Sequence, residues 1–131
     1  MKRMKIINFV LFTVIVAFLA SCEYEFIEPK PVPPPPDPTD TVFFATDVVP
    51  IWEDNNCTNC HRPGGSPQLD LTAANAYNSL TTLGLYNVAN PMESRIYTFP
   101  HPLSGEHSYK YANETEAETI LLWIEQGAQN N

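Results

Sequence analysis

The 131-residue sequence predicts a small all-α domain over residues 41–131, preceded by two segments of different composition. Apolar residues recur at helical spacing in four stretches of this domain. Residues typical of helix starts and stops flank these stretches. Around Cys57 and Cys60 the sequence has no alternation of strand and helix patterns. These three observations favour helices over a sheet-based fold.

The first two helices are expected in the first half of the domain. One covers about residues 47–55 behind Thr46 as N-cap, with Pro50 in the first turn, where proline is tolerated. The next begins behind Thr72 and ends by Gly84.

Two more helices are expected toward the end of the chain. A short one has Asn90 as cap and continues through Tyr97. The last is the clearest: Asn113 caps it, Glu116 follows three residues later, and Gly127 stops it. Its predicted buried stripe consists of Ala117, Ile120, Leu121, Ile124 and Ala128, joined by Trp123, which is expected to pack on the first helix or on the haem.

The N-terminus has the composition of an export signal. Residues 1–5 are basic, and 6–20 form an apolar run that is too short to span a bilayer comfortably. The run ends in Leu19-Ala20-Ser21-Cys22, which resembles the lipobox of bacterial lipoproteins. The resemblance implies cleavage of residues 1–21, lipidation of Cys22, and a protein tethered to the periplasmic or cell-surface side of a membrane. The alternative is an uncleaved N-terminal anchor.

Residues 22–40 are predicted to be a linker. Seven of the thirteen prolines lie between Pro29 and Pro38. Proline fixes φ and lacks an N–H donor, so this stretch favours an extended polyproline II spacer of about 30 Å. A ligand for a proline-recognition module is the alternative, but the position behind a lipid anchor favours a stalk.

The predicted domain contains the string Cys57-Thr58-Asn59-Cys60-His61. A C-x-x-C-H sequence in an exported protein is the attachment signature of c-type haem. The spacing allows both thiols to add to the two haem vinyl groups, and His61 then lies under the iron as the proximal ligand. The motif therefore predicts one covalent haem, held by Cys57, Cys60 and His61.

The cysteine pair has three alternative roles: a disulfide, a redox pair and a zinc site. A disulfide between Cys57 and Cys60 would close a tiny loop and stabilise little. A thioredoxin-like redox pair needs a βαβ context, which the sequence lacks. Zinc could be bound by the two cysteines with His101 and His107. Haem is favoured because its attachment requires a histidine directly after the second cysteine, whereas zinc does not.

On this motif the sequence resembles the c-type cytochrome superfamily, specifically small mono-haem domains carried on bacterial lipoproteins. The resemblance runs from Phe43 to the end and includes residues 44–52 and 123–128. It implies an all-α fold in which an N-terminal helix leads into the motif and crosses a C-terminal helix over the haem edge.

The sixth iron ligand decides what such a protein does, and three residues could supply it: Met92, His101 and His107. In this superfamily the distal ligand commonly comes from a loop shortly before the final helix. His107 lies nearest to the Asn113 cap, so it is the first choice, Met92 the second and His101 the third.

Single-electron transfer is the function that this combination predicts, because no catalytic pair or phosphate-binding loop accompanies the motif. The alternatives are a haem-based peroxidase or gas sensor with a labile sixth ligand, and a haem subunit of a larger respiratory assembly. Three basic residues of the domain, Arg62, Arg95 and Lys110, could pair with haem propionates.

The charge of the chain predicts its partners. Removing Lys2, Arg3 and Lys5 with the signal leaves four of the seven basic side chains against all fifteen acidic ones, a formal charge of −11 before haem. Such an acidic chain is a poor candidate for nucleic-acid binding, which needs Lys and Arg. It predicts a redox partner with a basic docking patch and a brief, salt-sensitive encounter.

Overall fold

The computed structural model describes residues 31–65 and 68–131, so the predicted signal peptide, Cys22 and the first part of the linker lie outside the described residues. Residues Val32–Asn131 form one compact unit. Its described residues contain helices and no strand, which confirms the all-α class for this part of the chain.

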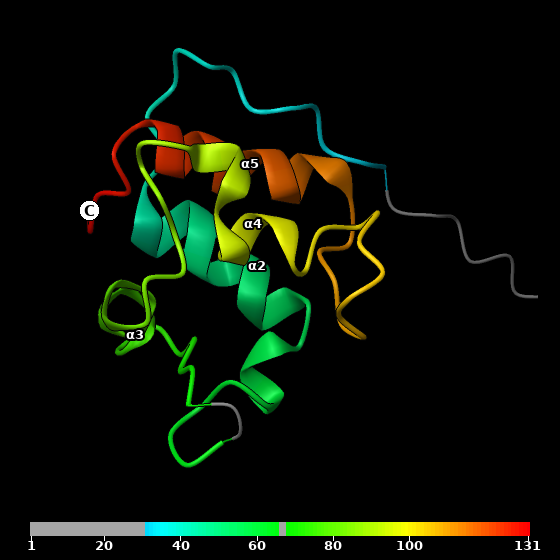
Figure 1. The fold of residues 1–131 in the computed structure, drawn as a ribbon. Helices are drawn as coiled ribbons and strands as arrows, with labels where there is room; N and C mark the ends of the chain where they lie inside the picture. Colours follow the sequence, from blue (N-terminus) through cyan, green and yellow to red (C-terminus); the bar gives the residue numbers. More distant parts are fainter. Residues whose placement is uncertain (1–30, 66–67) are drawn as a thin grey trace, which may run out of the picture. The chain divides into compact units, whose positions relative to one another are not determined.

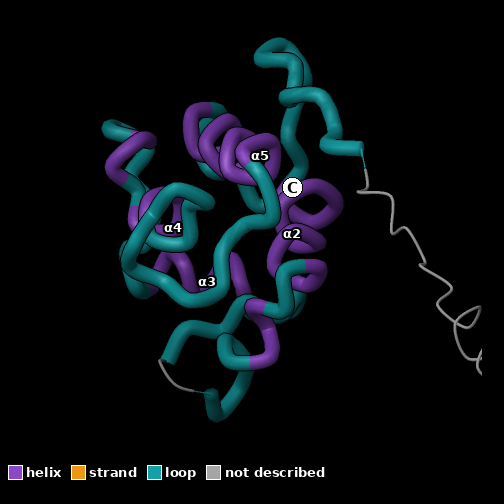
Figure 2. Tube along the Cα trace, turned by 90° about the vertical axis from the view of Figure 1, so that its right-hand side faces the viewer, coloured by secondary structure: helices purple, strands orange, loops and turns teal. Residues whose placement is uncertain are grey.

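Seven helical elements follow one another in this unit (Figures 1 and 2). They are the π-helical turn η1 (Phe44–Val48), α2 (Val49–Asp54), the 3-10 turn η2 (Cys57–Asn59), α3 (Ala76–Thr82), the 3-10 turn η3 (Pro91–Glu93), α4 (Arg95–Thr98) and α5 (Glu114–Glu125). No helix within the described ranges is both long and apolar enough to cross a membrane.

The core joins the two ends of the unit. Phe44 in η1 packs on Trp123 of α5, with ring centroids 5.1 Å apart, and on Trp52 of α2 at 5.8 Å. Both tryptophans are fully buried, and Trp123 contacts Phe44 of η1, directly before the first predicted helix. The other fully enclosed core residues are Val48, Ala76, Leu80, Ala117, Ile120 and Ile124.

Helix α5 follows its sequence signals closely. The side-chain oxygen of Asn113 accepts the backbone N–H of Glu116 at 3.0 Å, as an N-cap does. Gly127, with φ +94°, ends the helix in the left-handed conformation that glycine tolerates. The predicted buried stripe was wrong at one position, because Leu122 is buried while Leu121 is only half-buried.

The starts of the first two helices differ from prediction. Thr46 is not an N-cap: the helical chain begins at Phe44, where the Asp47 carboxylate accepts the N–H of Phe43 at 2.7 Å. Thr72 is not the cap of α3, because its hydroxyl donates to the Asp70 carboxylate at 2.6 Å. The caps are instead Phe43 and Asn75, and neither helix start has a side-chain cap hydrogen bond.

The short helix expected from Asn90 through Tyr97 is divided into η3 and α4. Ser94 separates them with an extended backbone, φ −62° and ψ 127°. The Ser94 side chain is buried, and its hydroxyl accepts the N–H of Asn87 at 2.9 Å. The break thus coincides with a buried serine whose side chain binds the backbone seven residues earlier.

The described end of the predicted linker lies on the domain. The Gln126 side chain accepts the N–H of Val42 at 2.9 Å and donates to the carbonyl of Asp40 at 2.7 Å. Nearer the start of α5, the Thr115 hydroxyl donates to the carbonyl of Pro33 at 2.9 Å. Extended backbone has no internal hydrogen bonds, so these side chains satisfy its polar groups.

Candidate functional site

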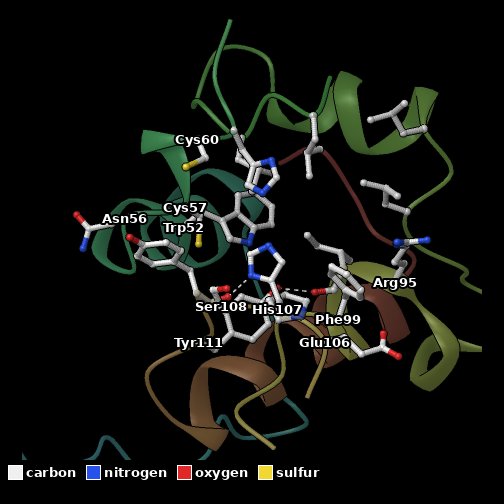
Figure 3. A pocket seen from close by; sticks show the side chains of 18 of the residues that line it. Trp52, Asn56, Cys57, Cys60, Arg95, Phe99, Glu106, His107, Ser108 and Tyr111 are labelled. Carbon is white, nitrogen blue, oxygen red and sulfur yellow. Dashed lines mark hydrogen bonds between the residues drawn. The ribbon is translucent and has the colours of Figure 1, made fainter. Parts of the chain in front are cut away.

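A largely apolar cavity of about 680 Å³ opens between the Cys57–His61 segment, α4 and the loop before α5 (Figure 3). Its volume lies within the usual range of small-molecule and cofactor sites. Its apolar lining consists of Trp52, Leu69, Leu71, Leu83, Leu85, Ile96, Phe99, Pro100, Tyr109 and Tyr111. Both cysteines of the motif, His61 and His107 also line it.

Local backbone geometry brings the cysteine motif to one wall. After α2, Asn56 adopts a left-handed conformation with φ 59°, which turns the chain into η2. The carbonyl of Cys57 then accepts the N–H of Cys60 at 3.2 Å and that of His61 at 2.9 Å. The motif is thus folded into a single turn whose three functional side chains line the same cavity.

The two cysteines are free thiols in different surroundings. Cys57 is buried, and burial is the main cause that raises the pKa of its thiol to about 11. Cys60 is exposed at the cavity wall. A redox-active cysteine of the thioredoxin type has a lowered pKa, so the surroundings of Cys57 do not favour that alternative.

His61 is held in the same turn with 8% of its surface exposed. Its carbonyl accepts the N–H of Leu71 at 2.9 Å, and its Nδ1 is enclosed without a hydrogen-bond partner among the described residues. Burial and the nearby His107 lower the pKa of His61, against a smaller raising effect of the Leu69 backbone. The neutral imidazole that this favours is the form that binds metals.

His107 lines the same cavity from the loop before α5 (Figure 3). The ring centroids of His107 and His61 are 6.0 Å apart, and the two planes differ by 24°. Nδ1 of His107 donates to the carbonyl of Tyr109, so Nε2 carries the free lone pair. The Phe99 ring contacts the imidazole in a T-shaped arrangement, with the ring centroids 5.3 Å apart.

The other two distal candidates lie elsewhere. Met92 in η3 is 67% exposed and does not line the cavity. His101 lines a separate hollow, where its Nε2 is 3.3 Å from the carboxylate of Glu114. The four residues weighed as zinc ligands are therefore not brought together. Within the two described ranges, no group of three or more His, Cys, Asp or Glu side chains is arranged to hold a metal ion.

One structural link at the site was missed from the sequence. A single carboxylate oxygen of Glu116 accepts from Nδ2 of Asn55 at 2.6 Å and from the N–H of Ala112 at 2.8 Å. Glu116 thereby joins the end of α2, which precedes Cys57, to the loop that carries His107. The capping pattern marked Glu116 as a cap residue, but nothing in the sequence indicated a bond to Asn55.

A second link ties the same loop to α4. The hydroxyl of Tyr111 donates to the carbonyl of Ile96 at 2.5 Å, and the N–H of Tyr111 donates to the carbonyl of Pro100 at 2.9 Å. Tyr111 is buried, and burial raises the pKa of its phenol far above the usual value. The phenol therefore serves as a permanent hydrogen-bond donor.

Comparison with known proteins provides no relative: no family profile, curated protein or solved structure matches the chain. The interpretation of the site therefore depends on its residues and their geometry.

Proposed function

We propose that this chain is a lipid-anchored c-type cytochrome, exported from the cytoplasm, that transfers single electrons through one covalently bound haem. The observation that carries the proposal is the pair of near-parallel imidazoles, His61 and His107, 6.0 Å apart across a cavity whose wall presents two free thiols. Aromatic pairs also adopt this centroid separation, so the position of the two rings beside two free thiols, and not the separation alone, supports a metal between them. One metal atom bound by both accounts for such an arrangement.

The residues of the cavity fit a haem chemically. Cys57 and Cys60 would form thioether bonds: each S–H adds across a vinyl double bond, sulfur to one carbon and hydrogen to the other, and no oxidant is consumed. His61 and His107 would supply the two axial nitrogens. The apolar walls suit a large, flat, mainly hydrophobic group. When bound, the haem iron would supply reversible one-electron chemistry between its ferrous and ferric forms.

The protein itself would keep the positions of the two histidine ligands nearly unchanged during electron transfer. The hydrogen bond from His107 Nδ1 to the Tyr109 carbonyl holds the imidazole in one tautomer and orientation. His61 is fixed through its own backbone and by its burial. With two histidine ligands, the reduction potential is expected to be lower than with histidine and methionine.

His107 is supported as the distal ligand by its position. It lines the cavity opposite His61, whereas Met92 is on the surface and His101 is paired with Glu114 in another hollow. The order of preference from the sequence is therefore kept: His107 first, with Met92 and His101 as weaker alternatives.

The export and membrane part of the proposal depends on the N-terminal sequence alone. The basic start, the apolar run and the lipobox-like string ending at Cys22 support a lipid anchor on the periplasmic or cell-surface side of a bacterial membrane. The residues between Cys22 and Pro33, where the chain reaches the domain, would connect the domain to the lipid.

Acidic side chains on α5 support the proposal of a basic redox partner. Three glutamates of this helix are exposed: Glu114, Glu118 and Glu125. The pKa of Tyr97 is raised mainly by its burial and further by these three carboxylates. They therefore gather near one residue of α4 instead of being scattered. A partner with a basic patch would be steered toward this charge, so the rate of electron transfer should fall as salt increases.

The decisive experiment is to express the full chain in a bacterium that matures c-type cytochromes and to purify it in detergent. We expect haem that remains attached after denaturation, and a low-spin spectrum in both redox states. Absence of covalent haem would contradict the proposal. A high-spin spectrum, or rapid binding of carbon monoxide by the reduced protein, would favour the peroxidase or gas-sensor alternative.

A further inference from the structure

Arg95 is the only positively charged side chain among the described residues that line the cavity. It begins α4, and Figure 3 shows it on the side of the cavity away from Cys57 and Cys60. Its guanidinium has no carboxylate partner within residues 31–65 and 68–131. A cation beside an apolar cavity, without a partner in the protein, is suited to an anionic group on the ligand.

The guanidinium is positioned by an aromatic ring. It stacks on Phe99 at 4.7 Å from the ring centroid, which is a cation–π contact. The same ring contacts His107 in a T-shaped arrangement, with the ring centroids 5.3 Å apart. Phe99 thus places the Arg95 charge next to the wall that carries His107, the proposed distal ligand.

The chemistry of haem gives this placement a meaning. Its two vinyl groups and its two propionates are on opposite edges of the ring. If the thiols hold the vinyl edge, the propionate edge lies on the far side of the cavity. We infer that Arg95 binds a haem propionate as a planar, charge-assisted donor; this inference rests on the proposed haem site.

The other basic residues of the domain are less suited to this role. Nζ of Lys110 already donates to the carbonyls of Ser104 and Pro102. Arg62 is exposed and does not line the cavity. Glu106 is the one acidic residue of the described lining, and its carboxylate would repel a propionate, which makes a compensating cation more necessary.

The test uses the full chain matured with haem, as three variants and the parent. Arg95→Gln removes the charge, Arg95→Lys keeps the charge without the planar fork, and Arg62→Gln is a matched charge loss outside the cavity. Resonance Raman spectroscopy reports the propionate-bending band, and the optical spectrum reports axial ligation.

We expect the propionate band to shift toward the position of a solvent-exposed propionate in Arg95→Gln and to lie in between in Arg95→Lys. It should stay unchanged in Arg62→Gln, with low-spin haem in all variants. An unshifted band in Arg95→Gln with intact low-spin haem overturns the role of Arg95 and leaves the proposed function standing. If Arg95→Gln does not mature with haem, the test uses Arg95→Lys. A shifted propionate band in that variant then supports the role of Arg95, and an unshifted band overturns it. A parent without covalent haem overturns both.

Discussion

The two walls of the cavity are built in different ways. On the motif side, backbone hydrogen bonds follow one another through the turn: the carbonyls of Ile51, Asn56 and Cys57 accept from residues three to four positions later. On the other side, the loop of residues 99–112 is held largely by side chains, and Leu103 and Tyr109 are 82% and 57% exposed.

This difference separates what local sequence can encode from what it cannot. The positions of Cys57, Cys60 and His61 follow from one helical turn, so a five-residue motif is enough to predict them. The position of His107 depends on groups far away in the chain, such as Asn55 acting through Glu116. We therefore expect substitutions in the Cys57–His61 turn to abolish attachment of the proposed haem. Substitutions in the loop of residues 99–112 should instead alter the ligation of its iron.

The largest effect is expected from removing the thiols of the motif. In the double variant Cys57→Ala and Cys60→Ala, covalent haem should fall from full occupancy to none, because no other thiol lines the described part of the cavity. Haem staining of a denaturing gel measures this. Cys22→Ala is the matched control: it should keep covalent haem and lose the lipid. Haem retained in the double variant would contradict the motif assignment.

The next largest effect is expected from His107→Ala. The haem should remain attached while its spectrum changes from low-spin to high-spin, and carbon monoxide should bind the reduced protein rapidly. Met92→Ala and His101→Ala are the matched controls and should keep the spectrum of the parent. An unchanged low-spin spectrum in His107→Ala would show that His107 is not the distal ligand. The control variant whose spectrum becomes high-spin would then identify the residue that is.

A glycine can test how tightly the motif side is packed. A Cβ added at Gly65 would lie 2.1 Å from the carbonyl oxygen of Cys60, whereas one added at Gly105 in the opposite loop meets nothing within 4 Å. Gly65→Ala should therefore lower the free energy of unfolding by about 1–3 kcal/mol, as overpacking does. Gly105→Ala should change it little. Equal effects in denaturant titrations would show that the two walls are equally tight.

An effect of similar size to that of Gly65→Ala is expected at the link between the walls. Glu116→Ala leaves Nδ2 of Asn55 and the N–H of Ala112 without their acceptor, which should cost about 1–3 kcal/mol of unfolding free energy. Glu118→Ala is the control, because this exposed glutamate of the same helix should contribute within about 0.5 kcal/mol.

A readout at the haem separates this link from a merely stabilising contact. In the Glu116→Ala holoprotein, carbon monoxide should compete with the distal ligand severalfold faster than in Glu118→Ala. Equal rates in the two variants would mean that Glu116 stabilises the fold without positioning the loop.

Much of the helical framework could be predicted from the sequence, because its signals are local. The Asn113 cap, the Gly127 stop and the burial of Trp123 all follow from patterns within α5. The starts of the first two helices could not be predicted, since Thr46 and Thr72 do not cap them: Asp47 binds the N–H of Phe43, and Asp70 binds the Thr72 hydroxyl. The choice between Leu121 and Leu122 depended on the surface that α5 meets.

By itself, the sequence determined the helical class and the C-x-x-C-H turn, and it predicted the export signal and the linker, because each depends on neighbouring residues. Only the tertiary structure decided that His107, and neither Met92 nor His101, faces His61, and that Arg95 lies at the cavity while Arg62 does not. These placements depend on contacts between residues distant in the chain, and no local spacing encodes them.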